Sequence, residues 1–591
     1  MLFVIGQWLY SGIICSLVGL GGVRLLTWRR NPVDFAIPSL PLVGLAGLAV
    51  LSFALQFLSI CISLDIVVHL LVVVGCLVFA ITNFEFVRQA GRHYVQQLLA
   101  ISRLTFLLLF LTFIIVLIRA TDPPASYDSG LYHIQAIKWI EHYPAIPGLG
   151  NLHGRFGFDS LWFVVTAFFG PSSVGLASSY TLNGFVFLLV VTWFLGAFEG
   201  RGSPHTNLTR KARVLFFSIL GLDVIGNFYP VLSSPSTDQT PMLLIPIILI
   251  LFPVSEEKQD EVDSQKPGLN FWLILIFSVF SVLIKLSTAP ILLAPLFLLV
   301  RYYRRDYRRI LGAGLVFVCA FGPFVMRNII ISGYPVYPIP GLDLFNFDWK
   351  IPQSLVMNEK NWIESWARIP GRDQAEVLKL SFSNWFPTWW ANQSSLNVSL
   401  LVGLLGLTVA NLGYFIYAWR KKTAILNLYL KFGFFYALLY LASVYWFLSA
   451  PDFRFGYGFL LSLLVLLLLP FLKSIPGQFF KIKVKKSILV AGICWQFLVL
   501  CQVFVSKPIQ DVLVLPYPVP VVSLKTNSVQ GITIYSPVSG DQCWDSPLPC
   551  SPYLNAGLGL RGSDLKSGFT YNCQAPNCFT NPGLKLRPLK E

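Results

Sequence analysis

Long apolar segments, separated by short polar ones, follow one another along almost the whole chain. An apolar segment of about 17–25 residues is long enough to cross a hydrocarbon core about 30 Å thick. The pattern therefore predicts an all-α polytopic membrane protein with about fourteen transmembrane helices. We expect these helices over residues 2–23, 36–60, 64–82, 101–118, 172–198, 213–229, 237–253, 270–286, 288–301, 310–331, 396–418, 425–448, 456–472 and 487–505.

Basic residues gather in six short clusters between these segments, and they set the expected orientation. If the segments cross alternately, all six clusters lie on one side, which the excess of Lys and Arg in cytoplasmic loops identifies as the cytoplasm. Both termini and the long loops would then face outward, away from the cytoplasm. The clusters begin at Arg24, Arg88, Arg201, Arg301, Arg420 and Lys473.

The polar segments divide the chain into three expected parts. Residues 1–100 form an N-terminal extension of three spans, 101–505 a transmembrane core, and 506–591 a small external tail. The core carries outer loops at 119–170 and 332–395, in which we expect interfacial helices, because the apolar stretch 158–170 is too short to cross.

Composition supports a membrane protein. Of the residues, 55% are hydrophobic and 12% are charged, whereas about 25% are charged in ordinary soluble proteins. The net charge of +16 comes largely from the clusters between spans. We therefore expect a lipid bilayer as the partner of the basic residues, and no nucleic acid.

The cysteines fall into two groups. Six lie inside apolar segments, where a free thiol acts as a small hydrophobic group. The other four lie in the polar tail: Cys543, Cys550, Cys573 and Cys578. Two local disulfides in an oxidising compartment are one interpretation. A site with four cysteine ligands is the other, although the spacings differ from those of zinc knuckles.

The polar block 121–170 holds half of the six histidines and is the first candidate for chemistry. Asp128 lies just before a helical pattern and can serve as its N-cap. A carboxylate at a helix start outside the membrane can also take a proton from an acceptor hydroxyl. Farther along, His153 and Arg155 lie among glycines, which fits either a tight surface loop or a phosphate contact.

Further candidates lie near the expected outer ends of spans. Asp238 begins one span, either as a helix-start residue or as a second acid. Lys285 ends another, where it either reaches the membrane surface or pairs with an anion. Arg327 ends a third, and Arg454 shares a short hairpin with Asp452, so these two can pair or Arg454 can face a lipid phosphate.

Two resemblances connect these candidates. The chain resembles, over most of residues 119–580, an uncharacterised family of large bacterial envelope membrane proteins, in the stretches YDSGLYHIQAIKWI, GNLHGRFGFDSLWF, IKLSTAP, RNIIISGYPVYP, APDFRFGYGF and DQCWDSPLPC. Its architecture, with an Asp in the first outer loop of the core, resembles the GT-C superfamily of polyprenyl-phosphate-sugar-dependent membrane glycosyltransferases. Asp128 stands alone where many GT-C enzymes have adjacent acids, so the resemblance supports no metal or other cofactor.

The GT-C resemblance implies a GT-C-like core over 101–505 and a glycosyltransferase in a bacterial inner membrane. A sugar would pass from a polyprenyl-phosphate donor to a glycan or lipid acceptor on the outer face. The implied catalytic residues are Asp128 as general base, with His133 or Asp238 as helper. The implied substrate or phosphate ligands are Tyr132, His153, Arg155, Lys285, Arg327 and Arg454. A polymerase or ligase of lipid-linked oligosaccharides and a non-enzymatic flippase or transporter are the alternatives.

Overall fold

The computed structural model describes residues 1–27, 37–199, 207–257 without 225 and 227, 268–473, 483–554 without 507, and 557–571. This part of the chain is helical almost throughout. The first half contains α1 (Leu2–Thr27), α2 (Leu40–Cys61), α3 (Ile66–Thr82), α4 (Phe84–Leu99), α5 (Arg103–Ala120), α6 (Ile134–His142), α7 (Leu149–Leu152), α8 (Leu161–Phe169), α9 (Leu182–Leu195), α10 (Asn207–Phe216), α11 (Gln239–Glu257) and α12 (Gly268–Ile284). The second half contains α13 (Leu293–Tyr302), α14 (Tyr307–Ser332), α15 (Gln353–Arg368), α16 (Gln374–Lys379), α17 (Phe382–Ala391), α18 (Ser395–Lys421), α19 (Ala424–Ser449), α20 (Phe453–Lys473) and α22 (Lys483–Ser506).

Helix length and composition confirm a polytopic helical membrane protein. Within the described ranges, eight helices are long and apolar enough to cross a membrane, namely α1, α2, α5, α14, α18, α19, α20 and α22. The bent pair α3 and α4, which meet at 92°, could supply a ninth. Four shorter apolar helices run over Leu182–Phe198, Gln239–Phe252, Gly268–Ile284 and Leu286–Tyr302. Length alone does not decide whether these also cross, so fourteen spans stays a prediction.

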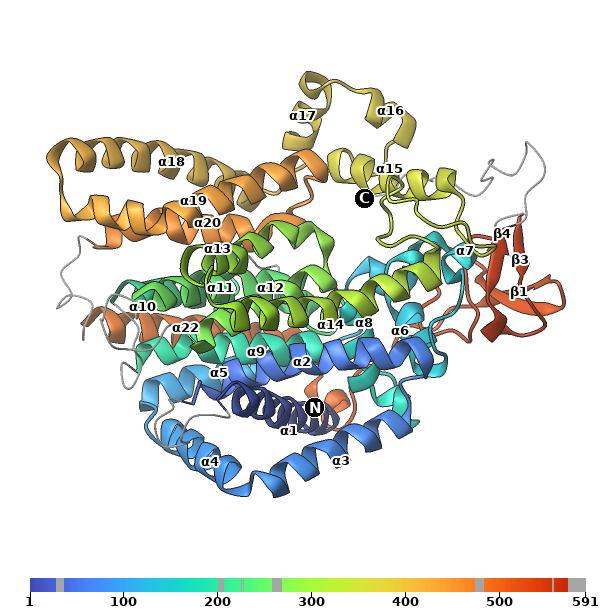
Figure 1. Cartoon of the computed structure of the whole chain (residues 1–591), viewed down its shortest axis with the longest axis horizontal. Coiled ribbons are helices and arrows are strands. Elements are labelled where there is room, and N and C mark those ends of the chain that lie inside the picture. Colours follow the sequence, from blue (N-terminus) through green and yellow to red (C-terminus); the bar gives the residue numbers. More distant parts are fainter. Residues whose placement is uncertain are drawn as a thin grey trace.

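The long helices lie roughly parallel to one another (Figure 1). In that view the α18–α19 turn marks one end of the bundle, and α6, α7 and the strands of the tail mark the other. The tail contains two antiparallel pairs, β1 (Leu524–Val529) with β2 (Ile532–Pro537) and β3 (Leu558–Leu560) with β4 (Phe569–Tyr571). The tail strands therefore gather beside the loop that follows α5.

Glycines allow α1 and α2 to pack closely. A Cβ at Gly47 would lie 1.8 Å from the carbonyl oxygen of Cys15, and one at Gly19 would lie 2.1 Å from that of Val43. Only glycine fits at such distances, as is typical of small residues between membrane helices. These contacts hold the first two helices of the N-terminal extension together.

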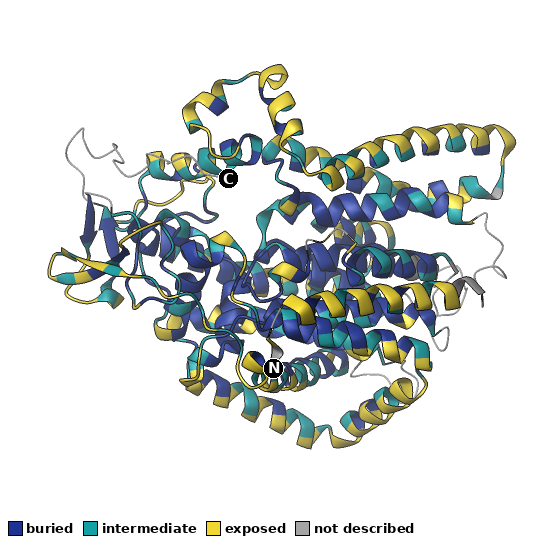
Figure 2. Ribbon diagram, turned by 180° about the vertical axis from the view of Figure 1, so that it is seen from behind, coloured by how far each residue is buried: buried dark blue, intermediate teal, exposed yellow. Residues whose placement is uncertain are grey.

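Burial differs sharply between central and peripheral helices (Figure 2). α8, α11 and α12 are mostly buried, whereas α18 exposes a row of large apolar side chains such as Leu405, Val409 and Leu412. Because these side chains lie on a helix long enough to cross the bilayer, lipid is the environment that suits them. α18 and α14 thus present apolar faces at the outside of the bundle.

Several expected segments differ from their predictions; the span expected over 172–198, for example, is α-helical only from Leu182 on. The stretch 158–170 was expected at the membrane interface, but all nine residues of α8 are buried in the protein, because α8 packs against α2 and α6. The expected span 213–229 is not one helix. α10 passes into a π-helical turn, Phe217–Gly221, and a 3₁₀ turn follows at Tyr229–Val231.

Candidate functional site

Asp128 lies at a break in the helical pattern. Residues Ser129–His133 form a π-helical turn that continues into α6. Isolated π turns inside helices are frequent at functional sites. The carboxylate makes no capping hydrogen bond, although Asp128 occupies the N-cap position. The N-cap interpretation is therefore wrong, and the carboxylate is directed toward other partners.

Two arginines from distant parts of the chain approach the Asp128 carboxylate. Arg155, from the glycine-rich loop, places Nη1 3.9 Å from Oδ1, and Arg454, at the start of α20, places Nη1 3.4 Å from Oδ2. Each arginine has a second carboxylate: Arg155 Nε lies 2.8 Å from Glu359 on α15, and Arg454 Nη2 lies 3.0 Å from Asp452.

A further ion pair, Lys285 with Asp238, belongs to the same group of charges. Lys285 lies 3.9 Å from the ring centroid of Phe455, the residue after Arg454. Lys285 therefore pairs with an anion, which was one of its two sequence interpretations. We call Asp128, Arg155, Asp238, Lys285, Glu359, Asp452 and Arg454 together the charged cluster.

The cations of the charged cluster keep Asp128 ionised. Burial, the largest effect, raises the pKa of Asp128, but the attraction of His133, which is charged only at low pH, and of Arg155, Arg454 and Lys285 outweighs it, and the pKa lies below its ordinary value. Burial lowers the pKa of His133 to about 4. The imidazole is thus neutral at neutral pH, and the permanent charges must come from the arginines and the lysine.

The histidines and Tyr132 take different positions around the cluster. His133 is buried between the rings of Tyr132 and Phe163, and its Nδ1 has no hydrogen-bond partner. Tyr132 lies under the Arg155 guanidinium, 5.6 Å from ring centroid to Cζ. His153 instead stacks on Tyr553 of the tail. Burial lowers the pKa of His153 to about 3, so this ring is a neutral packing group.

Arg327 lies outside the charged cluster. Its Nε donates to Asp159 at 3.0 Å and its Nη1 donates to the Ser59 carbonyl and hydroxyl oxygens, each at 3.1 Å. The side chains of Arg327 and Asp159 are 5% and 3% exposed. The guanidinium is therefore committed to a buried internal pair, which does not fit its expected role as a phosphate ligand.

The tail holds the Asp128 segment from both sides. Tyr127 donates its hydroxyl proton to Asp541, and Gln542 Nε2 donates to the Tyr127 carbonyl oxygen at 2.9 Å. Beyond Asp128, the Trp544 amide donates to the Gly130 carbonyl oxygen at 3.0 Å. On α6, two side chains continue this contact: Gln135 donates to the carbonyl oxygens of Trp544 and Ser546, and Lys138 pairs with Asp545 at 3.0 Å.

A disulfide joins Cys543 and Cys550 and closes the loop that makes these contacts. One of the two expected local disulfides is therefore confirmed. Cys573 and Cys578 lie outside the described residues. In the described part of the chain, no three His, Cys, Asp or Glu side chains gather as metal ligands would.

Gly130 offers a test of the contact between the tail and the Asp128 segment. A Cβ at Gly130 would lie 2.6 Å from the Trp544 ring. We expect Gly130→Ala to lower the free energy of unfolding by about 1–3 kcal/mol, the usual cost of overpacking. Thermal unfolding in nanodiscs measures it. The control, Gly91→Ala on α4, has open space around its Cβ; a Gly130→Ala protein as stable as this control would contradict the contact.

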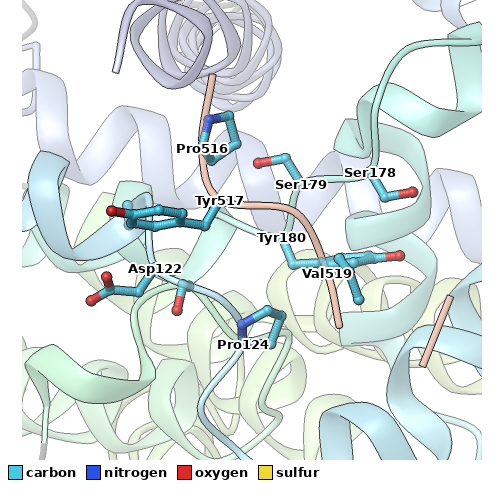
Figure 3. A pocket seen from close by; sticks show the side chains of 10 residues that line it. Asp122, Pro124, Ser178, Ser179, Tyr180, Pro516, Tyr517 and Val519 are labelled. Atoms are coloured by element: carbon cyan, nitrogen blue, oxygen red, sulfur yellow. The ribbon is translucent and has the colours of Figure 1, made fainter. Parts of the chain in front are cut away.

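A small pocket lies near the tail but does not include the charged cluster (Figure 3). Its walls come from Asp122 and Pro124 of the loop after α5, Ser178 to Tyr180, and Pro516, Tyr517 and Val519 of the tail. Its cavity volume is about 10 Å³, which is about the room that one water molecule needs. The tail closes this pocket through the Tyr517 amide, which donates to the Thr121 carbonyl oxygen at 2.9 Å.

Sequence reasoning missed several residues that the structure brings to the cluster. Glu359 pairs with Arg155, Tyr337 places its ring against Gly157, and Trp544 covers Gly130. Tyr337 and Trp544 lie in the stretches RNIIISGYPVYP and DQCWDSPLPC, but neither was expected at the site, and Glu359 lies in no such stretch. A sequence signal existed only for the glycines, since glycines around an arginine indicate that another group approaches the backbone closely.

Comparison with known proteins gives a family but no activity. Residues 1–461 match a family described as a domain of unknown function (DUF8201). No curated protein and no solved structure matches the chain. Because the match covers most of the sequence, the chain belongs to this family; the tail that holds Asp128 lies beyond the matched residues.

Proposed function

We propose that this member of the DUF8201 family is a membrane glycosyltransferase that moves a sugar from a polyprenyl-phosphate donor to an envelope glycan or lipid acceptor. The observation that carries the proposal is the ionised, largely buried Asp128 carboxylate between two arginines from separate elements. A carboxylate can accept the proton of an attacking hydroxyl. Arginines suit the negative charge that develops on a phosphate leaving group.

In the proposed reaction, the acceptor hydroxyl attacks the anomeric carbon of the sugar while Asp128 takes its proton. The bond from that carbon to the phosphate oxygen breaks, and polyprenyl phosphate leaves with the bonding electrons. Arg454, Lys285 and Arg155 are the proposed phosphate ligands, and Asp238 remains a proposed helper through Lys285. An attack from the side opposite the leaving group inverts the anomeric configuration.

Donor binding would also make Asp128 a better base. The neighbouring cations hold its pKa low, which weakens its attraction for a proton. A phosphate that draws Arg155 and Arg454 toward itself removes part of this effect and adds a nearby negative charge. Both changes raise the pKa of the Asp128 carboxyl. The base would therefore gain strength when the leaving group is in place.

The membrane arrangement belongs to the same proposal. We place the charged cluster and the tail on the outer face of a bacterial inner membrane, with about fourteen spans in a GT-C-like core. The Cys543–Cys550 disulfide supports this side, because disulfides persist in oxidising compartments. The end of the bundle that carries α6, α7 and the tail strands would then face outward.

A donor-discharge assay tests the proposed function. The purified protein, in nanodiscs with polyprenyl-phosphate-linked sugars extracted from bacterial envelopes, is incubated with and without envelope glycan, and released polyprenyl phosphate is measured by mass spectrometry. We expect release that depends on both the protein and the acceptor. Movement of the intact lipid-linked sugar to the other leaflet, without cleavage, would instead identify a transporter and contradict the enzyme.

A further inference from the structure

Arg155 lies closer to the carboxylate of Glu359 than to that of Asp128. Its guanidinium is 18% exposed and lies 2.8 Å from a Glu359 carboxylate that is 16% exposed. Glu359 belongs to α15, which is outside the helices long enough to cross the membrane. The strongest partner of a core arginine thus comes from a peripheral helix.

The loop that holds Arg155 is shaped around this carboxylate. A Cβ at Gly154 would lie 3.2 Å from Glu359 Oε2 and 3.6 Å from the Tyr337 hydroxyl oxygen. A Cβ at Gly157 would lie 2.9 Å from the Tyr337 ring. The two glycines therefore leave room for an oxyanion and a phenol against the backbone, on either side of Arg155.

The hydroxyl of Tyr337, which lies beside Gly154, is a buried donor without a hydrogen-bond partner. The Tyr337 side chain is 2% exposed. Burial, followed by the negative charge of Glu359, raises the pKa of Tyr337, so the hydroxyl keeps its proton. A buried hydroxyl without a hydrogen-bond partner destabilises the folded protein. An oxygen that accepted this proton in a hydrogen bond would remove part of that destabilisation.

The charge balance of the cluster shows why an incoming anion must displace something. Its three cations, Arg155, Lys285 and Arg454, are outnumbered by four carboxylates, Asp128, Asp238, Glu359 and Asp452. A phosphate added to this set would enter a region that already has a net negative charge. If one carboxylate leaves as the phosphate arrives, the repulsion is much smaller.

Of the four carboxylates, Glu359 is the one whose helix can carry it away. The segment of Asp128 is held by the tail, Asp452 lies in the short link between α19 and α20, and Asp238 directly precedes the buried helix α11. α15 is held at its start, where Val356 packs with Tyr334, Tyr337 and Ile351, and at its end, where Ser365 and Ala367 are buried, while residues 357–364 between these points are partly or fully exposed.

We propose that Arg155, Tyr337 and the glycines beside them form an oxyanion subsite, that Glu359 occupies it in the unliganded protein, and that a phosphate oxygen of the ligand replaces the Glu359 carboxylate. The inference rests on the proposed function for the identity of the ligand as a phosphate. Glu359 is then a competitor for the site, and α15 a latch that opens when phosphate binds.

Phosphate affinity in matched variants tests the exchange. The full-length protein in nanodiscs is titrated with polyprenyl monophosphate incorporated in the bilayer and, separately, with inorganic phosphate. We expect Glu359→Gln to bind about tenfold more tightly than the wild type, because a charged competitor is gone. Arg155→Gln is expected to bind at least about tenfold more weakly. The control is Glu364→Gln on the same helix, where Glu364 pairs with Lys360 at 3.4 Å; its affinity should equal that of the wild type.

The two probes separate the sources of the phosphate. If Glu359→Gln gains tenfold in affinity for both probes, the subsite binds the phosphate group itself. If the affinity rises for the lipid alone, the subsite binds a membrane-anchored headgroup. Equal affinity of Glu359→Gln and the wild type for both probes would overturn the exchange. That result would leave donor discharge by the wild type, and with it the proposed function, intact. Conversely, a Glu359 effect without any discharge would support the subsite and contradict the transferase.

Hydrogen exchange of the wild type provides a second measurement that needs no variant. If Glu359 leaves Arg155 when phosphate binds, amide exchange in α15 should increase on addition of polyprenyl monophosphate, while exchange in the buried α11 stays constant. Unchanged exchange in α15 at saturating phosphate would overturn the latch. This test remains decisive even if Glu359→Gln fails to fold.

Discussion

Replacing Asp128 by asparagine should lower turnover about 10²–10⁴-fold, the usual contribution of a general base, while the donor still binds. Asparagine keeps the shape of the side chain but cannot accept the proton of the attacking hydroxyl. Arg155 and Arg454 keep Glu359 and Asp452 as partners, so the substitution leaves neither guanidinium unpaired. The donor-discharge assay gives turnover, and titration with polyprenyl monophosphate gives binding.

The matched control is Asp122→Asn, six positions earlier in the same loop. Asp122 pairs with Arg119 at 3.8 Å and is not part of the charged cluster. We expect this variant to keep wild-type turnover. If Asp128→Asn also kept it, Asp128 would serve only to hold the arginines in place, and the proposed mechanism would be wrong.

The pH dependence of the wild type gives a further check on the same residue. Since the pKa of Asp128 lies below its ordinary value, the carboxylate stays ionised as pH falls from neutral to mildly acidic. Loss of the base form in the free protein begins only when pH falls toward that lowered pKa. The discharge rate at low donor concentration should therefore be flat across the mildly acidic range.

Arg327→Met should destabilise the protein by about 3–5 kcal/mol, the cost of leaving one partner of a buried ion pair alone. The substitution would leave the Asp159 carboxylate, which is 3% exposed, without its cation and with the uncharged Gln56 amide as a donor to its Oδ2. Methionine has a similar length but supplies no charge. The thermal midpoint in nanodiscs should fall accordingly.

Two further variants show whether the effect comes from the unpaired charge. The double variant Arg327→Met/Asp159→Leu removes both charges and should recover much of the lost stability, because the stranded carboxylate is gone. Arg88→Gln removes an arginine that is 47% exposed and pairs with Glu85 on α4. Such surface pairs contribute about 0–1 kcal/mol. A single Arg327→Met protein as stable as Arg88→Gln would refute the buried-pair interpretation.

Much of the helical architecture could be predicted because membrane helices are encoded locally. The helices α2, α14 and α20 could be identified from the length of their apolar segments, since each segment must match the thickness of the bilayer. The break at α10 could not be predicted in the same way. Its apolar residues continue past Phe216, and only packing with neighbouring helices decides that the chain leaves the α-helical path there.

The site was predictable only where its residues carry a local signal. Asp128 stood out as a single acid before an amphipathic helix, and Arg155 as an arginine among glycines. Arg327 stood out as an arginine at the end of an expected span. Its partner Asp159 lies 168 positions earlier, however, and the sequence alone does not show which charges form an ion pair. Glu359 and Trp544 were missed because their importance comes entirely from residues that are distant in the chain.

The contact between the tail and the Asp128 segment also has a consequence for the order in which the site is assembled. The loop closed by Cys543 and Cys550 follows α22, the last long helix in the described chain. During synthesis, every helix that carries the charged cluster is therefore finished before the segment around Asp128 receives its final support. The contacts of Tyr127, Gly130 and Gln135 with residues 541–546 can form only after all of these helices have been synthesised.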